Sequence, residues 1–346
     1  MAFLLNKIDI AGFLKLAETI PVADVRSPSE FVRGHIPGAF NIPLFSDEER
    51  AAVGTKYRKE GRTRAILKGL ELTGPEMHQK LRHALKIAKD NTILIHCWRG
   101  GMRSEAMAWL FSLGDLTTYV LENVYNSYRH SVISGLAEKR KVIVLGGMTG
   151  SSKTHILKHI RDLGNQVIDL EGLANHKGSA FGALGQPPQP SPEHFSNMLW
   201  EEWRKTDADI PVWLEDESRN IGTVFMPNEF YDHIRYSPAI ILKMPVEKRL
   251  PRLIEEYSTY PSERLIESVN RISKRIGGDN ARDAMAAIEA NDYAKAIEIT
   301  LRYYDKTYMY SISKNHTGQV IYIETDTGNI EENAVRVLEA SKRITP

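Results

Sequence analysis

The sequence has almost no cysteine and no long hydrophobic run. Cys97 is the only cysteine among 346 residues, so an intramolecular disulfide is excluded and a reducing, cytoplasmic compartment is expected. No apolar stretch approaches the roughly 20 residues that a membrane-spanning helix needs. The first residues show no basic region followed by an apolar run, so no signal peptide is expected and a membrane is not among the predicted partners. The formal net charge is only +1, so any nucleic acid has to bind a local basic surface.

The length and the alternation of elements predict two α/β domains. A chain of 346 residues can bury two separate cores. Apolar stretches typical of strands alternate with helical patterns, which predicts a mostly parallel sheet in each half. We expect one domain at 1–135, which carries Cys97, and a second at 140–346, in which residues of about 246–310 form a helical segment.

The expected elements follow from hydrophobic periodicity and from turn residues. In the first half we expect strands at 21–26, 40–43, 92–95 and 116–121, and helices at 47–59, 75–89, 104–113 and 125–139. In the second half we expect strands at 142–145, 166–170, 211–214, 239–244 and 319–324, with helices at 153–163 and 330–342. Residues 178–192 are rich in Gly, Pro and Gln and predict a long loop, which in a compact domain is often functional.

Cys97 lies between a predicted buried strand and a predicted helix. Backbone N–H groups at the start of a helix have no partner inside it, so they and the helix dipole favour a thiolate and can hold an anion. Two glycines in the loop allow a tight turn, and Arg99 and Arg103 add positive charge. We predict that Cys97, Arg99 and Arg103 are catalytic. The alternative is that Cys97 is a small buried side chain at a strand end.

A glycine-rich stretch in the second half predicts a phosphate-binding loop. The residues Gly146-Gly147-Met148-Thr149-Gly150-Ser151-Ser152-Lys153-Thr154 follow an apolar strand and open a helix, which is the context that a P-loop requires. The predicted phosphate-binding residues are Gly147, Gly150, Ser151, Ser152, Lys153 and Thr154. Thr154 is also predicted to bind magnesium. Ser152 replaces the glycine that usually precedes the lysine. A serine is accommodated there if its φ is not positive, and a tighter fit or a weaker nucleotide affinity is the alternative. The alternative is a chance glycine-rich turn.

Acidic residues end another predicted strand of this half. The stretch Val212-Trp213-Leu214-Glu215-Asp216-Glu217 resembles the strand that holds magnesium in P-loop proteins. Glu215 or Asp216 would hold the magnesium ion, but spacing does not decide which of the three carboxylates, Glu217 included, does so. A solvated acidic loop is the alternative. We take Asp216, together with Thr154, as the candidate magnesium ligands. Lys177 and Arg219 follow strand ends and are further candidates for facing phosphate, although most such residues are simply solvated.

The motifs of the first half, taken as a set, resemble the rhodanese family. They are Asp24-Val25-Arg26, Glu30-Phe31, Gly34-His35-Ile36-Pro37-Gly38-Ala39 and the strand–loop–helix turn at Cys97. Five residues separate Cys97 from Arg103, a longer loop than sulfur-transfer rhodaneses usually have. That length is similar to the loop of rhodanese-related phosphatases and arsenate reductases, which cradles a tetrahedral oxyanion. Asp24 and Arg26 are equally compatible with a direct role and with a buried structural pair.

Both halves together resemble the tRNA 2-selenouridine synthase family. The resemblance rests on the pairing of the two domains and on the strings Cys97-Trp98-Arg99-Gly100-Gly101-Met102-Arg103-Ser104, Asp169-Leu170-Glu171-Gly172-Leu173-Ala174-Asn175-His176-Lys177-Gly178-Ser179, Phe181-Gly182 and Glu215-Asp216-Glu217-Ser218-Arg219-Asn220-Ile221-Gly222. It implies that selenium from selenophosphate replaces sulfur in wobble 2-thiouridine of tRNA. It also implies an S-geranylated intermediate made from geranyl diphosphate. We expect the P-loop to bind the prenyl diphosphate or a nucleotide, and Cys97 to handle selenium. No tightly bound cofactor is expected apart from possible Mg²⁺.

Two surfaces are predicted from the same resemblance. The tRNA surface is expected on the helical segment, with the cations Arg249, Arg252, Arg264, Arg271, Lys274 and Arg275 and the tyrosines Tyr303, Tyr304 and Tyr308. Interleaved glutamates make a salt-bridged solvated face the alternative. An apolar slot for a prenyl chain is expected from Phe181, Phe195, Trp200 and Trp203, with ordinary core packing as the alternative.

Two other functions remain open on the sequence. One is a P-loop kinase or ATPase with a regulatory rhodanese module. The other is a non-enzymatic protein that binds RNA or senses persulfides. The oligomeric state is not predicted.

Overall fold

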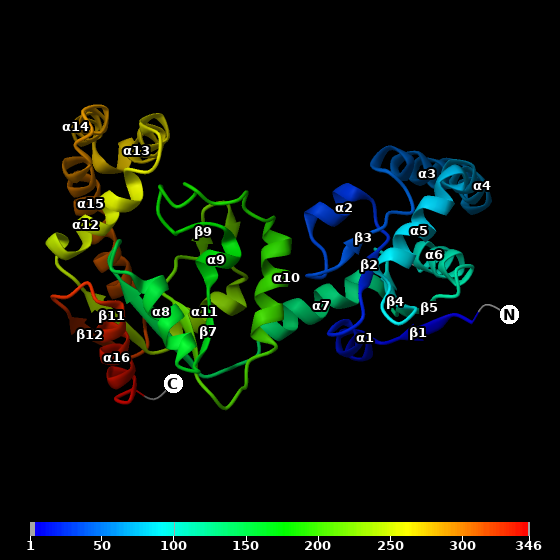
Figure 1. Cartoon of the computed structure of the whole chain (residues 1–346), viewed down its shortest axis with the longest axis horizontal. Coiled ribbons are helices and arrows are strands. Elements are labelled where there is room, and N and C mark those ends of the chain that lie inside the picture. Colours follow the sequence, from blue (N-terminus) through cyan, green and yellow to red (C-terminus); the bar gives the residue numbers. More distant parts are fainter. Residues whose placement is uncertain (1–3, 100, 345–346) are drawn as a thin grey trace. The chain divides into compact units, whose positions relative to one another are not determined.

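The computed structural model describes residues 4–99 and 101–344 and divides the chain into two compact units, 1–135 and 136–346 (Figure 1). Each unit contains one five-stranded sheet in which all the strand pairs are parallel. The predicted α/β class with mostly parallel sheets is confirmed. Within the described ranges, no helix combines the length and the apolar character needed to cross a membrane.

The first unit has the strand order β1-β5-β4-β2-β3. Its strands are β1 (Asn6–Ile8), β2 (Val22–Asp24), β3 (Phe40–Asn41), β4 (Thr92–His96) and β5 (Thr117–Leu121). Its helices are α1 (Ile10–Ala17), α2 (Pro28–Arg33), α3 (Asp47–Glu60), α4 (Arg62–Thr73), α5 (Met77–Ile87), α6 (Met102–Ser112) and α7 (Val124–Leu136). The middle strand β4 is apolar and buried along most of its length, as expected where helices cover a parallel sheet.

The sequence prediction missed strand β1 and helices α1 and α4. Helix α4 begins directly after Gly61, whose φ of 84° ends α3 and reverses the chain. It exposes Leu67 and Leu70 while burying Ala65 and Gly69. Because its large apolar residues do not lie on the buried face, the helical period is hidden in the sequence.

The second unit has the strand order β12-β11-β6-β8-β7, with a separate two-stranded ribbon of β9 and β10. Its strands are β6 (Val142–Gly147), β7 (Gln166–Ile168), β8 (Val212–Glu215), β9 (Asn220–Ile221), β10 (Val224–Phe225), β11 (Ala239–Lys243) and β12 (Val320–Glu324). Its helices are α8 (Lys153–Asp162), α9 (Leu170–Ala174), α10 (Pro192–Trp203), α11 (Asn228–Tyr236), α12 (Val246–Tyr257), α13 (Ser262–Ile276), α14 (Gly278–Glu289), α15 (Tyr293–Asn315) and α16 (Ile330–Ser341). Every residue of β6 and β8 is buried.

Three sequence predictions can be compared with the structure of this unit. Residues 246–310 are helical as predicted, and they form α12 to α15, with α13 and α14 packed beside α15 (Figure 1). The predicted loop at 178–192 contains neither helix nor strand before α10 starts at Pro192. The predicted strand at 166–170 is too long, because the Asp169 side chain accepts the Gly172 N–H at 2.7 Å and starts helix α9.

Candidate active site

The loop after β4 places the thiol of Cys97 in the core. The Cys97 side chain is completely buried among apolar residues of the first unit. Ser104 Oγ donates to Cys97 Sγ at 3.4 Å, and helix α6 starts after Gly101, which has a φ of 74°. Gly100 lies outside the described residues. The strand–loop–helix context was predicted, but the thiol lies inside the protein rather than on an open surface.

The two loop arginines lie in different surroundings. Arg103 donates to Glu30 Oε2 at 2.7 Å, so a carboxylate already balances its charge. Arg99 is exposed and lines a cavity beside Trp98 and Gly101. Of the two predicted cations, Arg99 is therefore the one available to an incoming anion.

Asp24 and Arg26 form a fully buried ion pair. Arg26 Nε lies 2.9 Å from both carboxylate oxygens of Asp24, and Arg26 Nη2 donates to the Gly34 carbonyl at 2.6 Å. The guanidinium carbon lies 3.8 Å from the ring centre of Tyr125. These contacts fix β2 against the following turn. The interpretation of Asp24 and Arg26 as a buried structural pair is therefore sufficient to explain them. Burial lowers the pKa of the neighbouring His96 to about 4, so its imidazole is neutral near pH 7.

The P-loop connects β6 to α8, and its groups are held by distant residues. Lys153 Nζ donates to the Gly147 carbonyl at 3.0 Å. The Gly147 N–H donates to the Tyr308 hydroxyl at 2.6 Å, so this predicted phosphate donor already has a protein partner. Gly150 has a φ of 83°, which a glycine adopts without strain, and Ser151 is buried.

Ser152 has a left-handed backbone conformation. Its φ is 64° and its ψ is 23°, in the left-handed region that favours glycine. The condition under which a serine is accommodated without cost, a φ that is not positive, is therefore not met. The loop keeps the backbone geometry of the usual glycine and carries a serine there, which costs about 1 kcal/mol of backbone strain.

Thr154 meets two glutamates rather than Asp216. The Thr154 hydroxyl lies 2.7 Å from Glu215 Oε1 and 3.1 Å from Glu171 Oε2. Burial, and then the nearby Glu171 carboxylate, raises the pKa of Glu215 to about 8. Burial also raises the pKa of Glu171, and it raises that of Glu217 well above its usual value. A hydroxyl and carboxylates are suitable magnesium ligands, although no cluster of three or more metal-binding side chains occurs in the described part of the chain.

Asp216 belongs to a different network, which sequence reasoning missed. Tyr308 of α15 donates its hydroxyl proton to Asp216 Oδ2 at 2.7 Å, and His316 Nε2 lies 2.8 Å from Asp216 Oδ1. Asp216 is therefore bound to residues about 100 positions later in the chain. The sequence offered no signal for this contact, because neither Tyr308 nor His316 belongs to a motif.

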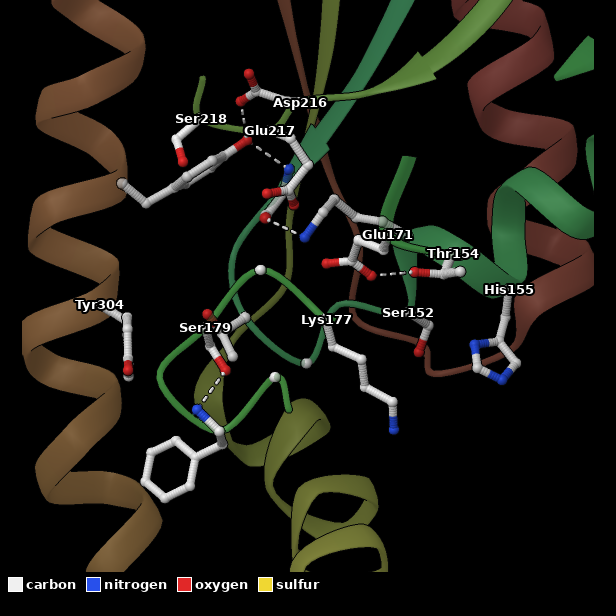
Figure 2. A pocket seen from close by; sticks show the side chains of 18 of the residues that line it. Ser152, Thr154, His155, Glu171, Lys177, Ser179, Asp216, Glu217, Ser218 and Tyr304 are labelled. Carbon is white, nitrogen blue, oxygen red and sulfur yellow. Dashed lines mark hydrogen bonds between the residues drawn. The ribbon is translucent and has the colours of Figure 1, made fainter. Parts of the chain in front are cut away.

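A pocket of about 500 Å³ opens over the P-loop (Figure 2). Lys177 lines it and forms an ion pair with Glu256 of α12. Arg219 is exposed and is not among the lining residues; its Nε donates to the Met226 carbonyl at 3.4 Å. The structure therefore brings Lys177, but not Arg219, to the phosphate-binding loop.

The predicted apolar slot is mostly core. Phe181 lines the pocket, with its ring centre 5.1 Å from that of Tyr257. Phe195, Trp200 and Trp203 are buried on α10 and do not line the pocket. Core packing accounts for these three, and Phe181 alone remains next to the P-loop.

The helical segment provides fewer tRNA-facing residues than predicted. Arg249 is buried and is held by Asp305, and Tyr308 is occupied by the P-loop and Asp216, so neither can reach RNA from the surface. The exposed cations of α13 are Arg264, Arg271, Lys274 and Arg275. Two of these, Arg264 and Arg271, approach Glu267 within 3.5 Å and 2.8 Å.

Comparison with known proteins assigns each of the two units to a protein family. A family model for the AAA domain of tRNA 2-selenouridine synthase matches residues 140–334, and one for the rhodanese-like domain matches residues 10–131. The tRNA 2-selenouridine synthase of Sulfurovum sp. (strain NBC37-1) is 33% identical over 85% of this chain and 89% of its own length. The corresponding protein of Shewanella frigidimarina is 34% identical over 86% of this chain and 90% of its own length. That of Nitrosomonas europaea is 38% identical over 72% of this chain and 66% of its own length. The chain belongs to the tRNA 2-selenouridine synthase family of enzymes.

Proposed function

We propose that this protein replaces the sulfur of wobble 2-thiouridine in tRNA with selenium, and that selenophosphate supplies the selenium. The observation that supports this most strongly is the presence, in one chain, of a thiol loop after β4 and a P-loop pocket after β6. Both are built to face anions, through helix N-termini and nearby cations. Two of the relatives named tRNA 2-selenouridine synthase align with 85% and 86% of this chain, so the alignments include parts of both units.

The P-loop pocket is proposed as the site of geranyl diphosphate. The sulfur of 2-thiouridine attacks C1 of the geranyl group, the C–O bond breaks, and diphosphate leaves with the electron pair. Lys153 and backbone N–H groups of the loop would stabilise the charge on that leaving group. Phe181 would offer an apolar contact to the prenyl chain. In the following step the selenium of selenophosphate attacks C2 of the base, and the C–S bond breaks so that the geranyl thiolate leaves with the electron pair. Water then cleaves the Se–P bond, phosphate is released, and selenium stays on C2.

Magnesium, if the reaction uses it, is assigned to Thr154 and Glu215 rather than to Asp216. The Thr154 hydroxyl already lies beside the Glu215 carboxylate, and Glu215 Oε2 is buried without a hydrogen-bond partner. When bound there, the ion would neutralise part of the charge of the diphosphate.

Cys97 is proposed to handle selenium in the first unit. Because its side chain is buried, the loop that holds it has to open before Sγ meets a substrate. Arg99, exposed at the rim of the neighbouring cavity, would attract the anionic selenium donor. A lone thiol with this role suits the reducing cytoplasm.

The tRNA surface is proposed on α13, where Lys274 and Arg275 are exposed and have no ion-pair partner among the described residues. Such cations contact backbone phosphates, and their contribution to the binding affinity decreases as the salt concentration rises. Charge reversal at both positions should weaken retention of tRNA and reduce the slope of that salt dependence.

The function is tested with purified protein, selenophosphate, geranyl diphosphate and thiolated tRNA. We expect mass spectrometry of digested tRNA to show 2-selenouridine, and Cys97→Ser to abolish it while keeping the core filled. Wild-type conversion by Cys97→Ser would contradict the role of the thiol. Steady ATP turnover without tRNA would instead favour a kinase or ATPase, and tRNA retention without any product would favour a binding protein.

A further inference from the structure

Ser152 is strained, and its side chain has a specific partner. The residue holds a left-handed backbone conformation that glycine would adopt without cost. Its hydroxyl accepts a hydrogen bond from Arg252 Nη1 at 2.7 Å. Arg252 belongs to α12 and lies 100 residues further along the chain. Strained residues persist where the surrounding structure makes use of them, and here the use is a contact with a cation.

The guanidinium of Arg252 is held by neutral groups alone. Its Nη2 lies 2.8 Å from the ring nitrogens of His155. Burial and the nearby Arg252 charge lower the pKa of His155, which favours the neutral imidazole that can accept a hydrogen bond. Among the described residues, no carboxylate lies within ion-pair distance of Arg252. The guanidinium is therefore oriented without being neutralised.

Two cations near Arg252 are neutralised by carboxylates, whereas Arg252 is not. Arg249, one turn earlier on α12, is neutralised by Asp305 and bonds to the Thr149 carbonyl. Lys177 is paired with Glu256. Lys153 donates to a backbone carbonyl and, like Arg252, has no acidic partner within 4 Å in the described part of the chain. Lys153, Lys158 and Arg252 therefore line the same pocket without an ion-pair partner in the described part of the chain. Lys153 comes from the P-loop and Arg252 from α12.

We propose that Arg252, oriented by the Ser152 hydroxyl, forms a second phosphate-binding position in the P-loop pocket, next to the one formed by Lys153. The ligand class is a compound with two linked phosphates. A guanidinium can donate two parallel hydrogen bonds to one phosphate group, and a hydroxyl that fixes it beforehand lowers the entropy lost on binding. The inference rests on the proposed function only in taking this pocket as the diphosphate site.

The test measures binding of inorganic pyrophosphate to the full chain by titration calorimetry. Arg252→Ala should weaken binding about tenfold to a hundredfold, as expected for loss of charge-assisted hydrogen bonds. Ser152→Gly should weaken it by about threefold while leaving the unfolding temperature unchanged or higher, because glycine relieves the strain. Binding of inorganic phosphate should change less in both variants, since Lys153 can hold one phosphate alone.

The controls separate this inference from the proposed function. Arg336→Ala removes an exposed arginine of α16, paired with Glu332, and should bind pyrophosphate as the wild type does. Pyrophosphate affinity that is unchanged in Arg252→Ala, or that is unchanged or tighter in Ser152→Gly, would overturn the inference. Wild-type affinity in Lys153→Ala would instead show that the P-loop pocket is not the diphosphate site, and the proposed function would fail with it. Arg252→Lys, which keeps the charge, should recover part of the affinity and so excludes simple misfolding as the cause.

Discussion

Glu215 is buried at the end of β8, and replacing it with glutamine tests whether the folded protein holds it in the protonated form. The Glu215 side chain is completely buried and accepts the Thr154 hydroxyl through one oxygen. Burial, followed by the Glu171 carboxylate, raises its pKa from 4.5 to about 8. Glutamine has nearly the same shape as the protonated acid and keeps an oxygen for Thr154.

The expected magnitude follows from proton linkage. Between pH 4.5 and pH 8 the folded state holds a proton on Glu215 that the unfolded state has lost. A carboxyl group whose folded pKa is raised stabilises the fold below its unfolded pKa, and this stabilisation is lost as the pH rises through the folded pKa. One proton corresponds to about 1.4 kcal/mol per pH unit, so the wild type should lose about 3 kcal/mol relative to Glu215→Gln between pH 5.5 and pH 7.5.

Urea denaturation at several pH values measures this difference. Three of the five tryptophans, Trp200, Trp203 and Trp213, are buried in the second unit, and Trp213 lies two residues before Glu215 on the same strand. The change in tryptophan fluorescence on unfolding therefore includes the unfolding of this unit. Comparing the two proteins at each pH removes the contributions of titrating groups that do not interact with Glu215. If the two curves of unfolding free energy against pH run parallel, the raised pKa of Glu215 is refuted.

Three further predictions concern other buried groups. Asp305→Ala leaves the buried guanidinium of Arg249 without its carboxylate and should lower the unfolding free energy by about 3 to 5 kcal/mol in urea titrations. Asp305→Asn should lower the unfolding free energy by less, and an equal decrease in the two variants would contradict the reasoning. Tyr308→Phe removes a hydroxyl that bonds to both the P-loop and Asp216 and should cost about 1 to 3 kcal/mol, whereas no change in the urea midpoint would show that these bonds do not contribute. Iodoacetamide should label Cys97 far more slowly in the native protein than in urea, because the thiol is buried; equal rates would mean that the loop is open in solution.

The α/β class and the positions of the main motifs were predictable because they depend on neighbouring residues. The apolar run of β6, followed by glycines and by Lys153-Thr154, predicts a strand, a loop and a helix from contiguous sequence. The strand before Cys97 and the helix after it were predictable for the same reason. The local hydrophobic period failed at α4, whose large apolar side chains lie partly on the surface.

Only the tertiary structure decided which side chains meet at these motifs. Glu215 reaches Thr154 across 61 residues and Arg252 reaches Ser152 across 100, and no sequence period encodes such contacts. Parallel strands β6 and β8 end at the same edge of the sheet, and this register brings Glu215 to the P-loop while Asp216 bonds to Tyr308 and His316. The burial of Cys97 likewise depends on how the whole first unit packs around β4. The sequence by itself therefore determined where the phosphate loop and the thiol loop lie, whereas long-range packing determined which of their groups are neutralised, strained or free to bind.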